Sequence, residues 1–144
     1  PTTRAHQMAL YVIFESGFQM LADYPGAYRG TKELEFLRQV PAAWDETRGL
    51  GGRPGSWVSV ARRKGDVWYI GTITGAEARE VEIPLDRLLP AGRTYTAEIW
   101  ADAPDAAAHP KNTVRTTQTV TAATRLRARL APTGGHVVVL RPRQ

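Results

Sequence analysis

The character of the sequence changes near residue 48, and this change limits the folds that the chain can adopt. Upstream, the run RAHQMALYVIFES contains good helix formers and no helix-breaking residue before Gly17. From Gly49 onward, short segments with strand-like patterns alternate with turn signals such as LPAGR and PTGG. We therefore expect a short part built with helices, followed by a larger part built from antiparallel strands.

The larger part predicts a mainly β fold, an antiparallel β-sandwich. The segments that are typical of strands are SWVSVARR, VWYIGTIT, REVEIPL, TYTAEIWA, VRTTQTVT, RLRARLA and GHVVVLRP. In three of them the apolar residues alternate and so share one side of the strand: Val58 and Val60; Val81, Ile83 and Leu85; Tyr95, Ala97 and Ile99. Between the first two strands, RKGD is typical of a hairpin turn with Gly65 at a positive φ.

The first part looks like the end of a larger domain. Residues from Met8 to Phe14 would cover the whole circumference of a helix with apolar side chains, and such a helix belongs inside something large. GFQMLAD then fits a short buried strand, although a helical turn has the same pattern. TKELEFLRQVP is typical of an amphipathic helix that Thr31 caps, that packs through Leu34, Leu37 and Val40, and that Pro41 ends. Residues 1–43 are therefore expected to be the tail of an upstream α/β domain, and residues 44–144 the β domain.

Composition excludes several classes of function. The 144 residues contain no cysteine, which rules out disulfides and thiolate metal sites, and the three histidines are too widely spaced to form a zinc cluster. The longest apolar run is far shorter than the roughly 20 residues that span a bilayer, so no membrane span is expected. The net charge of +5 could serve nucleic acid, but Arg125, Arg127 and Arg129 alternate like a solvated strand face, and no nucleic-acid motif accompanies them.

Two sets of carboxylates are candidates for chemistry. Asp45 and Glu46 are adjacent, whereas paired catalytic carboxylates must face each other across a bond; these two fit a structural joint better, with Trp44 filling the seam and Arg48 as ion-pair partner. If GFQMLAD is a strand of a barrel, Asp23 lies at its carboxyl end, where barrel enzymes place their sites; the alternative is a turn-forming aspartate before Tyr-Pro-Gly.

Aromatic residues of the strands raise a second possibility. Trp57, Trp68, Tyr69 and Trp100 could form a platform on which sugars stack, so that the chain would be a carbohydrate-binding β-sandwich. The alternative is that these residues are core or domain-interface residues, as is common at strand positions in a small β domain.

The order of segments resembles the C-terminal region of glycoside hydrolase family 97. The resemblance runs from about residue 4 to residue 141 and is carried by RAHQMALYVIFESGFQMLADYP, by the specific strings WDET and ARRKGDVWYIG, and by YTAEIWADAPDA. One departure is Ser16-Gly17-Phe18, where the family usually has Ser-Pro-Leu.

This resemblance implies a bacterial α-glucosidase or α-galactosidase that is periplasmic or secreted. It implies that residues 1–43 close a (β/α)8 catalytic barrel, with GFQMLAD as its last strand, and that residues 44–144 form the C-terminal antiparallel β domain. The catalytic carboxylates, and the glutamates that hold calcium in some members, would lie upstream, so we expect no catalytic residue, metal or cofactor in this chain. Its partners would be the rest of the barrel and, through the parent enzyme, carbohydrate.

Overall fold

A computed structural model describes residues 2–14 and 32–144 of the chain. The described residues form two α-helices, eight β-strands and one short 3-10 helix. In chain order these are α1 (Arg4–Ile13), α2 (Lys32–Gln39), β1 (Glu46–Arg53), β2 (Trp57–Lys64), β3 (Val67–Thr74), β4 (Arg79–Ile83), η2 (Leu85–Arg87), β5 (Tyr95–Asp102), β6 (Thr113–Val120), β7 (Leu126–Leu130) and β8 (Gly135–Pro142). The prediction of a mainly β, antiparallel fold is confirmed.

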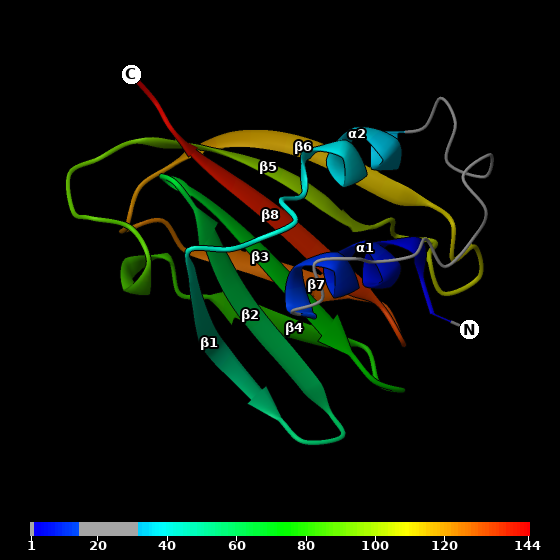
Figure 1. The fold of residues 1–144 in the computed structure, drawn as a ribbon. Coiled ribbons are helices and arrows are strands. Elements are labelled where there is room, and N and C mark those ends of the chain that lie inside the picture. Colours follow the sequence, from blue (N-terminus) through cyan, green and yellow to red (C-terminus); the bar gives the residue numbers. More distant parts are fainter. Residues whose placement is uncertain (1, 15–31) are drawn as a thin grey trace.

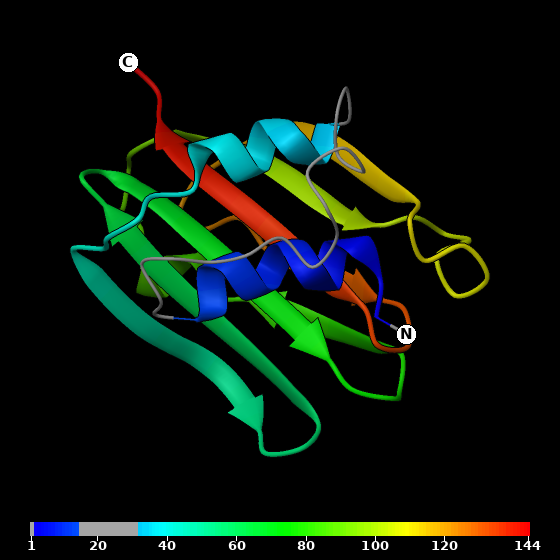
Figure 2. The same ribbon diagram turned by 45° about the vertical axis from the view of Figure 1, so that its right-hand side comes forward.

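The elements form three layers. The central layer is a six-stranded antiparallel sheet in the order β1-β2-β3-β8-β5-β6, and a two-stranded sheet, β4-β7, packs against one of its faces. Both helices lie on the opposite face, and α1 runs across β3 and β8 (Figures 1 and 2). The central strand β8 comes last in the chain, so β3 and β5 become neighbours only through it.

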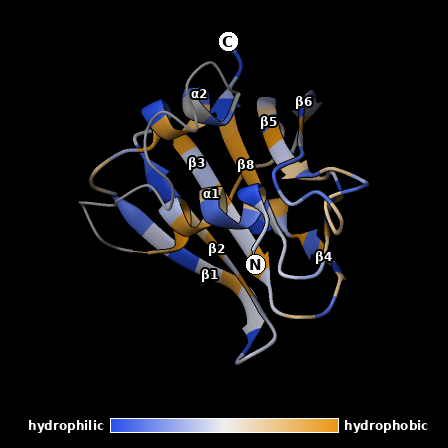
Figure 3. Cartoon of the chain, turned by 90° about the vertical axis from the view of Figure 1, so that its right-hand side faces the viewer, coloured by the Kyte–Doolittle hydropathy of each residue, from blue (hydrophilic) through white to orange (hydrophobic). Residues whose placement is uncertain are grey.

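Two hydrophobic clusters hold the layers together. One lies between the two sheets and contains Val81, Ile83 and Leu85, which are buried as the alternation predicted, although β4 ends at Ile83 and Leu85 belongs to η2. The other lies between the six-stranded sheet and the helices, and it contains Met8, Phe36 and Trp100. Figure 3 shows the hydrophobic residues concentrated along β3, β8 and β5. Each strand at the centre of the large sheet is therefore covered on both faces.

The first strand, β1, was not predicted from the sequence. β1 covers Glu46–Arg53, whereas the sequence predicted only a joint before residue 49; its residues are mostly exposed, and Leu50 alone is buried. Because β1 lies at the edge of the sheet and buries one side chain, it lacks the apolar alternation by which strands are recognised. The turn predicted around Gly65 is confirmed, since Gly65 has a φ of 60° between β2 and β3.

The helices differ in part from expectation. α1 buries Ala5, Met8, Ala9 and Val12 on the sheet, while Leu10 is half-buried. Among the α2 side chains that the structure describes, Phe36 and Glu33 are buried, whereas Leu37 is half-buried, as is Val40 just after the helix. The side chain of Leu34, also predicted to pack, lies outside the described side chains. The ring of Phe36 packs on Trp100 at a centroid distance of 5.1 Å, which fixes this helix over β5. The predicted Thr31 cap and the predicted strand GFQMLAD lie outside the described residues.

Candidate functional site

The segment between α2 and β1 begins with an aromatic contact. Trp44 meets Tyr69 of β3 edge-on, with the ring centroids 5.1 Å apart and an interplanar angle of 67°. The hydroxyl of Tyr69 donates to the carbonyl oxygen of Gln39 at 3.4 Å, at the end of α2. Trp44 therefore lies in the seam between the second helix and the sheet, where the sequence analysis placed it.

The adjacent carboxylates of Asp45 and Glu46 point to different partners. Asp45 Oδ2 accepts a hydrogen bond from the amide of Gly65 at 2.7 Å, and its carboxylate lies 3.7 Å from the ammonium group of Lys64. Glu46 pairs with the guanidinium groups of Arg48 and Arg63, the latter at 3.2 Å. These contacts fasten β1 to the β2–β3 hairpin. Glu46 and Arg48 are themselves residues of β1, so part of the predicted joint is strand.

The electrostatics of this cluster do not suit acid–base catalysis. The hydrogen bond from the Gly65 amide lowers the pKa of Asp45, and the hydrogen bond from Arg48 lowers the pKa of Glu46. A catalytic pair needs environments that push two pKa values apart, so that one carboxyl group can donate a proton while the other is ionised. Here both groups are stabilised as carboxylates, and neither environment raises a pKa as a general acid requires.

The tryptophans predicted as a stacking platform are mostly buried. The exposed fraction of Trp100 is 0% and that of Trp68 is 5%, so neither offers a ring face to a sugar. The Arg48 guanidinium lies 5.2 Å from the Trp68 ring, and the Arg115 guanidinium lies 5.5 Å from the Trp100 ring. The two tryptophans, Trp68 and Trp100, belong to the core because their strands lie inside the sheet and are covered by a second layer. Trp57 is half-buried and remains accessible.

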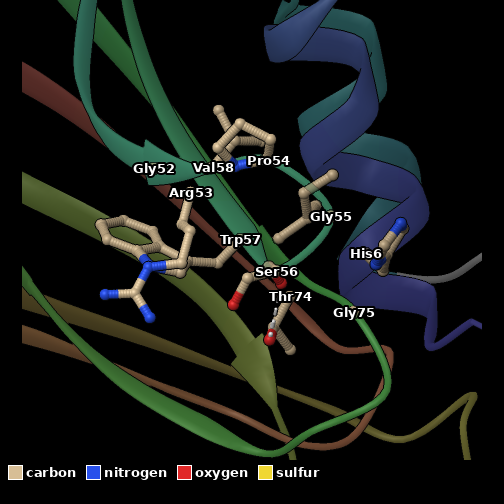
Figure 4. Close-up of a pocket in the computed structure, with 11 residues that line it drawn as sticks. His6, Gly52, Arg53, Pro54, Gly55, Ser56, Trp57, Val58, Thr74 and Gly75 are labelled. Carbon is tan, nitrogen blue, oxygen red and sulfur yellow. Dashed lines mark hydrogen bonds between the residues drawn. The ribbon is translucent and has the colours of Figure 1, made fainter.

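Trp57 lines a pocket of about 480 Å³ at one end of the large sheet. Its walls are the β1–β2 turn, the end of β3 and the first turn of α1 (Figure 4). The residues that line it are His6, Gly52, Arg53, Pro54, Gly55, Ser56, Trp57, Val58, Ile73, Thr74 and Gly75. The lining is mainly apolar and includes no carboxylate, so the pocket lacks the two carboxyl groups that glycoside hydrolysis requires.

A carboxylate that the sequence did not single out is half-buried and interacts electrostatically with His6 of the pocket lining. Asp102, at the end of β5, accepts hydrogen bonds from the amides of Ala131 at 2.8 Å and Gly135 at 3.1 Å. Burial raises its pKa, while the hydrogen bonds act in the opposite direction. A Cβ at Gly134 would lie 2.0 Å from Asp102 Oδ2, so the turn before β8 needs a glycine there. The only signal in the sequence is the glycine pair of PTGG.

His6 completes this corner of the molecule. Its Nδ1 lies 3.0 Å from the carbonyl oxygen of Gly134, which can only accept, so Nδ1 carries the proton. Burial lowers the pKa of His6. The first turn of α1 is thereby tied to the turn before β8. Because the His6 ring lies on the pocket wall, this contact fixes one side of the pocket. The role of the ring in this contact is structural.

The remaining candidates give no site. His136 is buried on β8, and burial lowers its pKa to about 4. Within residues 2–14 and 32–144, no three histidine or acidic side chains are grouped so that they could hold a metal ion. Neither described helix has the length and hydropathy that a bilayer crossing requires. Asp23, the predicted rim residue, lies outside the described residues.

The fold and these sites define a β-sandwich domain in which the adjacent carboxylates of Asp45 and Glu46 are held by cations and a backbone amide. Comparison with protein families matches residues 43–141 to a family described as "Glycosyl-hydrolase 97 C-terminal, oligomerisation". The chain therefore belongs to glycoside hydrolase family 97, as its C-terminal domain. The resemblance drawn from WDET and ARRKGDVWYIG is confirmed.

Relatives extend this match to almost the whole chain. A retaining alpha-galactosidase of Bacteroides thetaiotaomicron is 36% identical over 140 residues, which are 96% of this chain and 21% of the relative. A probable retaining alpha-galactosidase of Streptomyces bingchenggensis is 39% identical over 112 residues, which are 77% of this chain and 17% of the relative. The solved structure of a family 97 enzyme from Pseudoalteromonas sp. strain K8, in complex with acarbose, superposes with a TM-score of 0.92 at 34% identity. It is matched over 99% of this chain and 23% of its own, so the chain spans about a fifth of its relatives.

Proposed function

We propose that this chain is the non-catalytic C-terminal part of an α-glycoside hydrolase and that it serves assembly of the enzyme rather than bond cleavage. The observation that carries the proposal is the match of residues 43–141 to a domain whose description names oligomerisation. It is supported by the electrostatics of Asp45 and Glu46, which are both held as carboxylates, and by the pocket without carboxyl groups.

The substrate that we propose for the whole enzyme is a terminal α-galactoside, because two relatives are named as retaining or probable retaining alpha-galactosidases. A terminal α-glucoside is the alternative. In either reaction one carboxylic acid protonates the leaving oxygen, while a second carboxylate attacks or activates water. Both groups would come from the upstream barrel. We further propose that the enzyme is bacterial and acts in the periplasm or outside the cell, as the family resemblance implies.

We also propose that residues 1–43 close the catalytic barrel. The match to the C-terminal domain begins at residue 43, which supports a boundary at this point. The half-buried state of Leu10 and Tyr11 supports a role of α1 at an interface, because neither belongs to the buried face formed by Ala5, Met8, Ala9 and Val12. α1 would then pack on the β domain with one face and on the barrel with another.

The test is to express the 144-residue chain alone and to assay aryl α-galactosides and α-glucosides. No turnover is expected, and robust turnover would contradict the claim that the catalytic carboxylates lie upstream. Sedimentation of the same sample measures its oligomeric state. A monomer at every accessible concentration would contradict the proposed role in assembly.

A second candidate function is carbohydrate binding at the pocket, which the partial exposure of Trp57 favours. Titration with malto-oligosaccharides, followed by tryptophan fluorescence, distinguishes it. Saturable binding that is lost in Trp57→Ala but retained in Trp44→Ala would support this function. A flat titration would leave assembly as the role of the domain.

A further inference from the structure

The two edge strands of the six-stranded sheet differ in how readily they can pair with a strand of another chain. β1 forms one edge and β6 the other. An open edge presents unpaired N–H and C=O groups that can hydrogen-bond to another strand, and proteins that must prevent this interrupt or charge the edge. The two edges can therefore be compared for the devices that block association.

The β1 edge carries such devices. Its pairing with β2 shifts register between Gly49 and Gly51, which marks a bulge. Charged side chains stand along it at Glu46, Arg48 and Arg53. A bulged and charged strand is a poor template for a further strand. β1 is thus protected against association.

The β6 edge has no bulge and a single charged side chain, that of Arg115. β6 pairs with β5 without a register shift over eight residues, from Thr113 opposite Asp102 to Val120 opposite Tyr95. In the described part of the chain, β6 pairs with no strand other than β5. Six of its eight residues are threonine or valine, which favour extended backbone. Figure 1 shows β6 at the margin of the sheet.

Exposure along β6 is unusual for a strand of a packed sheet. The six residues 114–119 are all exposed, so within the described structure neither face of this stretch is covered by a second layer. Val114 is 38% exposed and is one of two large hydrophobic side chains described as exposed. A regular, β-branched and uncovered edge strand favours pairing with another chain.

The single charge of β6 is engaged with its own chain. Arg115 forms ion pairs with Glu98 of β5 and with Glu35 of α2, the latter at 2.6 Å. Its guanidinium also lies 5.5 Å from the ring of Trp100. Because two carboxylates compensate this charge, it adds little repulsion against an approaching strand.

We propose that β6 pairs antiparallel with β6 of a second copy of this chain, so that one sheet continues through both copies. This inference rests on the proposed role in oligomerisation, and it names the surface. If the two copies are related by a two-fold axis perpendicular to the sheet, paired residues of the two β6 strands project from the same face of the sheet. In the register centred on Thr116, Arg115 lies opposite Thr117 and Val114 opposite Gln118, so no like charges meet.

The test places like charges at the centre of this contact. Thr116→Lys brings two ammonium groups together across the two-fold axis and should raise the dimer dissociation constant about tenfold or more. Thr47→Lys is the matched control, because Thr47 is an exposed threonine on the opposite edge strand and should leave the constant unchanged. Analytical ultracentrifugation of the 144-residue chain measures the constant, and far-UV circular dichroism verifies that each variant is folded.

A second variant of opposite charge, Thr116→Glu, separates loss of the dimer contact from loss of folding stability. Thr116→Glu alone should also dissociate, whereas an equimolar mixture of Thr116→Lys and Thr116→Glu should recover the dimer. If the wild type is oligomeric and Thr116→Lys remains so, or if the mixture fails to recover, β6 is not the interface although the role in assembly stands. If the wild type is monomeric throughout, the proposed role fails and this inference fails with it.

Discussion

The carbonyl oxygen of Ala9 in α1 lies so close to Gly71 of β3 that a Cβ added at Gly71 would be 2.7 Å from it. Gly71→Ala must therefore push the helix away from the sheet, and we expect it to lower the free energy of unfolding by about 1–3 kcal/mol. Urea denaturation measures this change. Gly49→Ala is the control, since no atom lies within 4 Å of a Cβ there, and it should stay within about 0.5 kcal/mol of the wild type.

Asp102 should be a second determinant of stability. Asp102→Ala leaves the amides of Ala131 and Gly135 without their acceptor, and we expect a loss of about 2–4 kcal/mol in the free energy of unfolding. The control is Asp66→Ala, because Asp66 is exposed in the β2–β3 turn. Equal thermal midpoints for the two variants would contradict the role assigned to Asp102.

Acid should destabilise the domain through His136. Burial lowers the pKa of this ring to about 4 from its ordinary value of 6.5, so the unfolded chain binds more protons between these values. The free energy of unfolding should fall as the pH decreases from 6.5 to 4, by about 3 kcal/mol from this group. His6, whose pKa is also lowered, acts in the same direction, and Asp102, whose pKa is raised, acts in the opposite direction.

The contribution of His136 is isolated by substitution. His136→Gln should flatten the dependence of unfolding free energy on pH between 4 and 6.5, measured by urea denaturation at a series of pH values. His109→Gln, in the exposed loop between β5 and β6, should retain the wild-type slope. An unchanged slope in His136→Gln would show that another group governs the acid sensitivity.

Asp45 and Glu46 should be dispensable for turnover. Introduced into the whole hydrolase, Asp45→Asn and Glu46→Gln should leave kcat for an aryl α-galactoside within about twofold, because loss of a catalytic carboxylate usually costs at least a hundredfold. A hundredfold decrease in kcat with an unchanged thermal midpoint would indicate that this pair takes part in the reaction.

The sequence predicted those strands whose two faces meet different environments. Val81 and Ile83 alternate with charged residues because one side of β4 packs on the large sheet and the other meets water. Arg127 and Arg129 are exposed between the buried residues of β7, and Arg125 is exposed just before the strand, as the alternation indicated. In such strands local periodicity carries the information about burial.

The features that the sequence did not predict depend on contacts between segments that are distant in the chain, and local sequence patterns carry no information about such contacts. β1 was missed because it buries Leu50 alone, and Glu33 is buried in α2 because it hydrogen-bonds to Thr113, 80 residues further along the chain. The pocket likewise joins the first turn of α1 to the β1–β2 turn. The sequence showed Trp68 and Trp100 as aromatic strand residues, but only the layers over them explain their burial.

The central position of β8 has a consequence for how the domain is synthesised. Before residues 135–142 leave the ribosome, β1, β2 and β3 form one hairpin assembly, β5 and β6 form another, and no strand joins them. In the nascent chain these two parts of the sheet therefore remain unpaired until β8 emerges. Their apolar surface is exposed during this time and is available for chaperones to bind. Ribosome-stalled chains that end before residue 135 should remain sensitive to protease, and chains that carry β8 beyond the exit tunnel should become resistant.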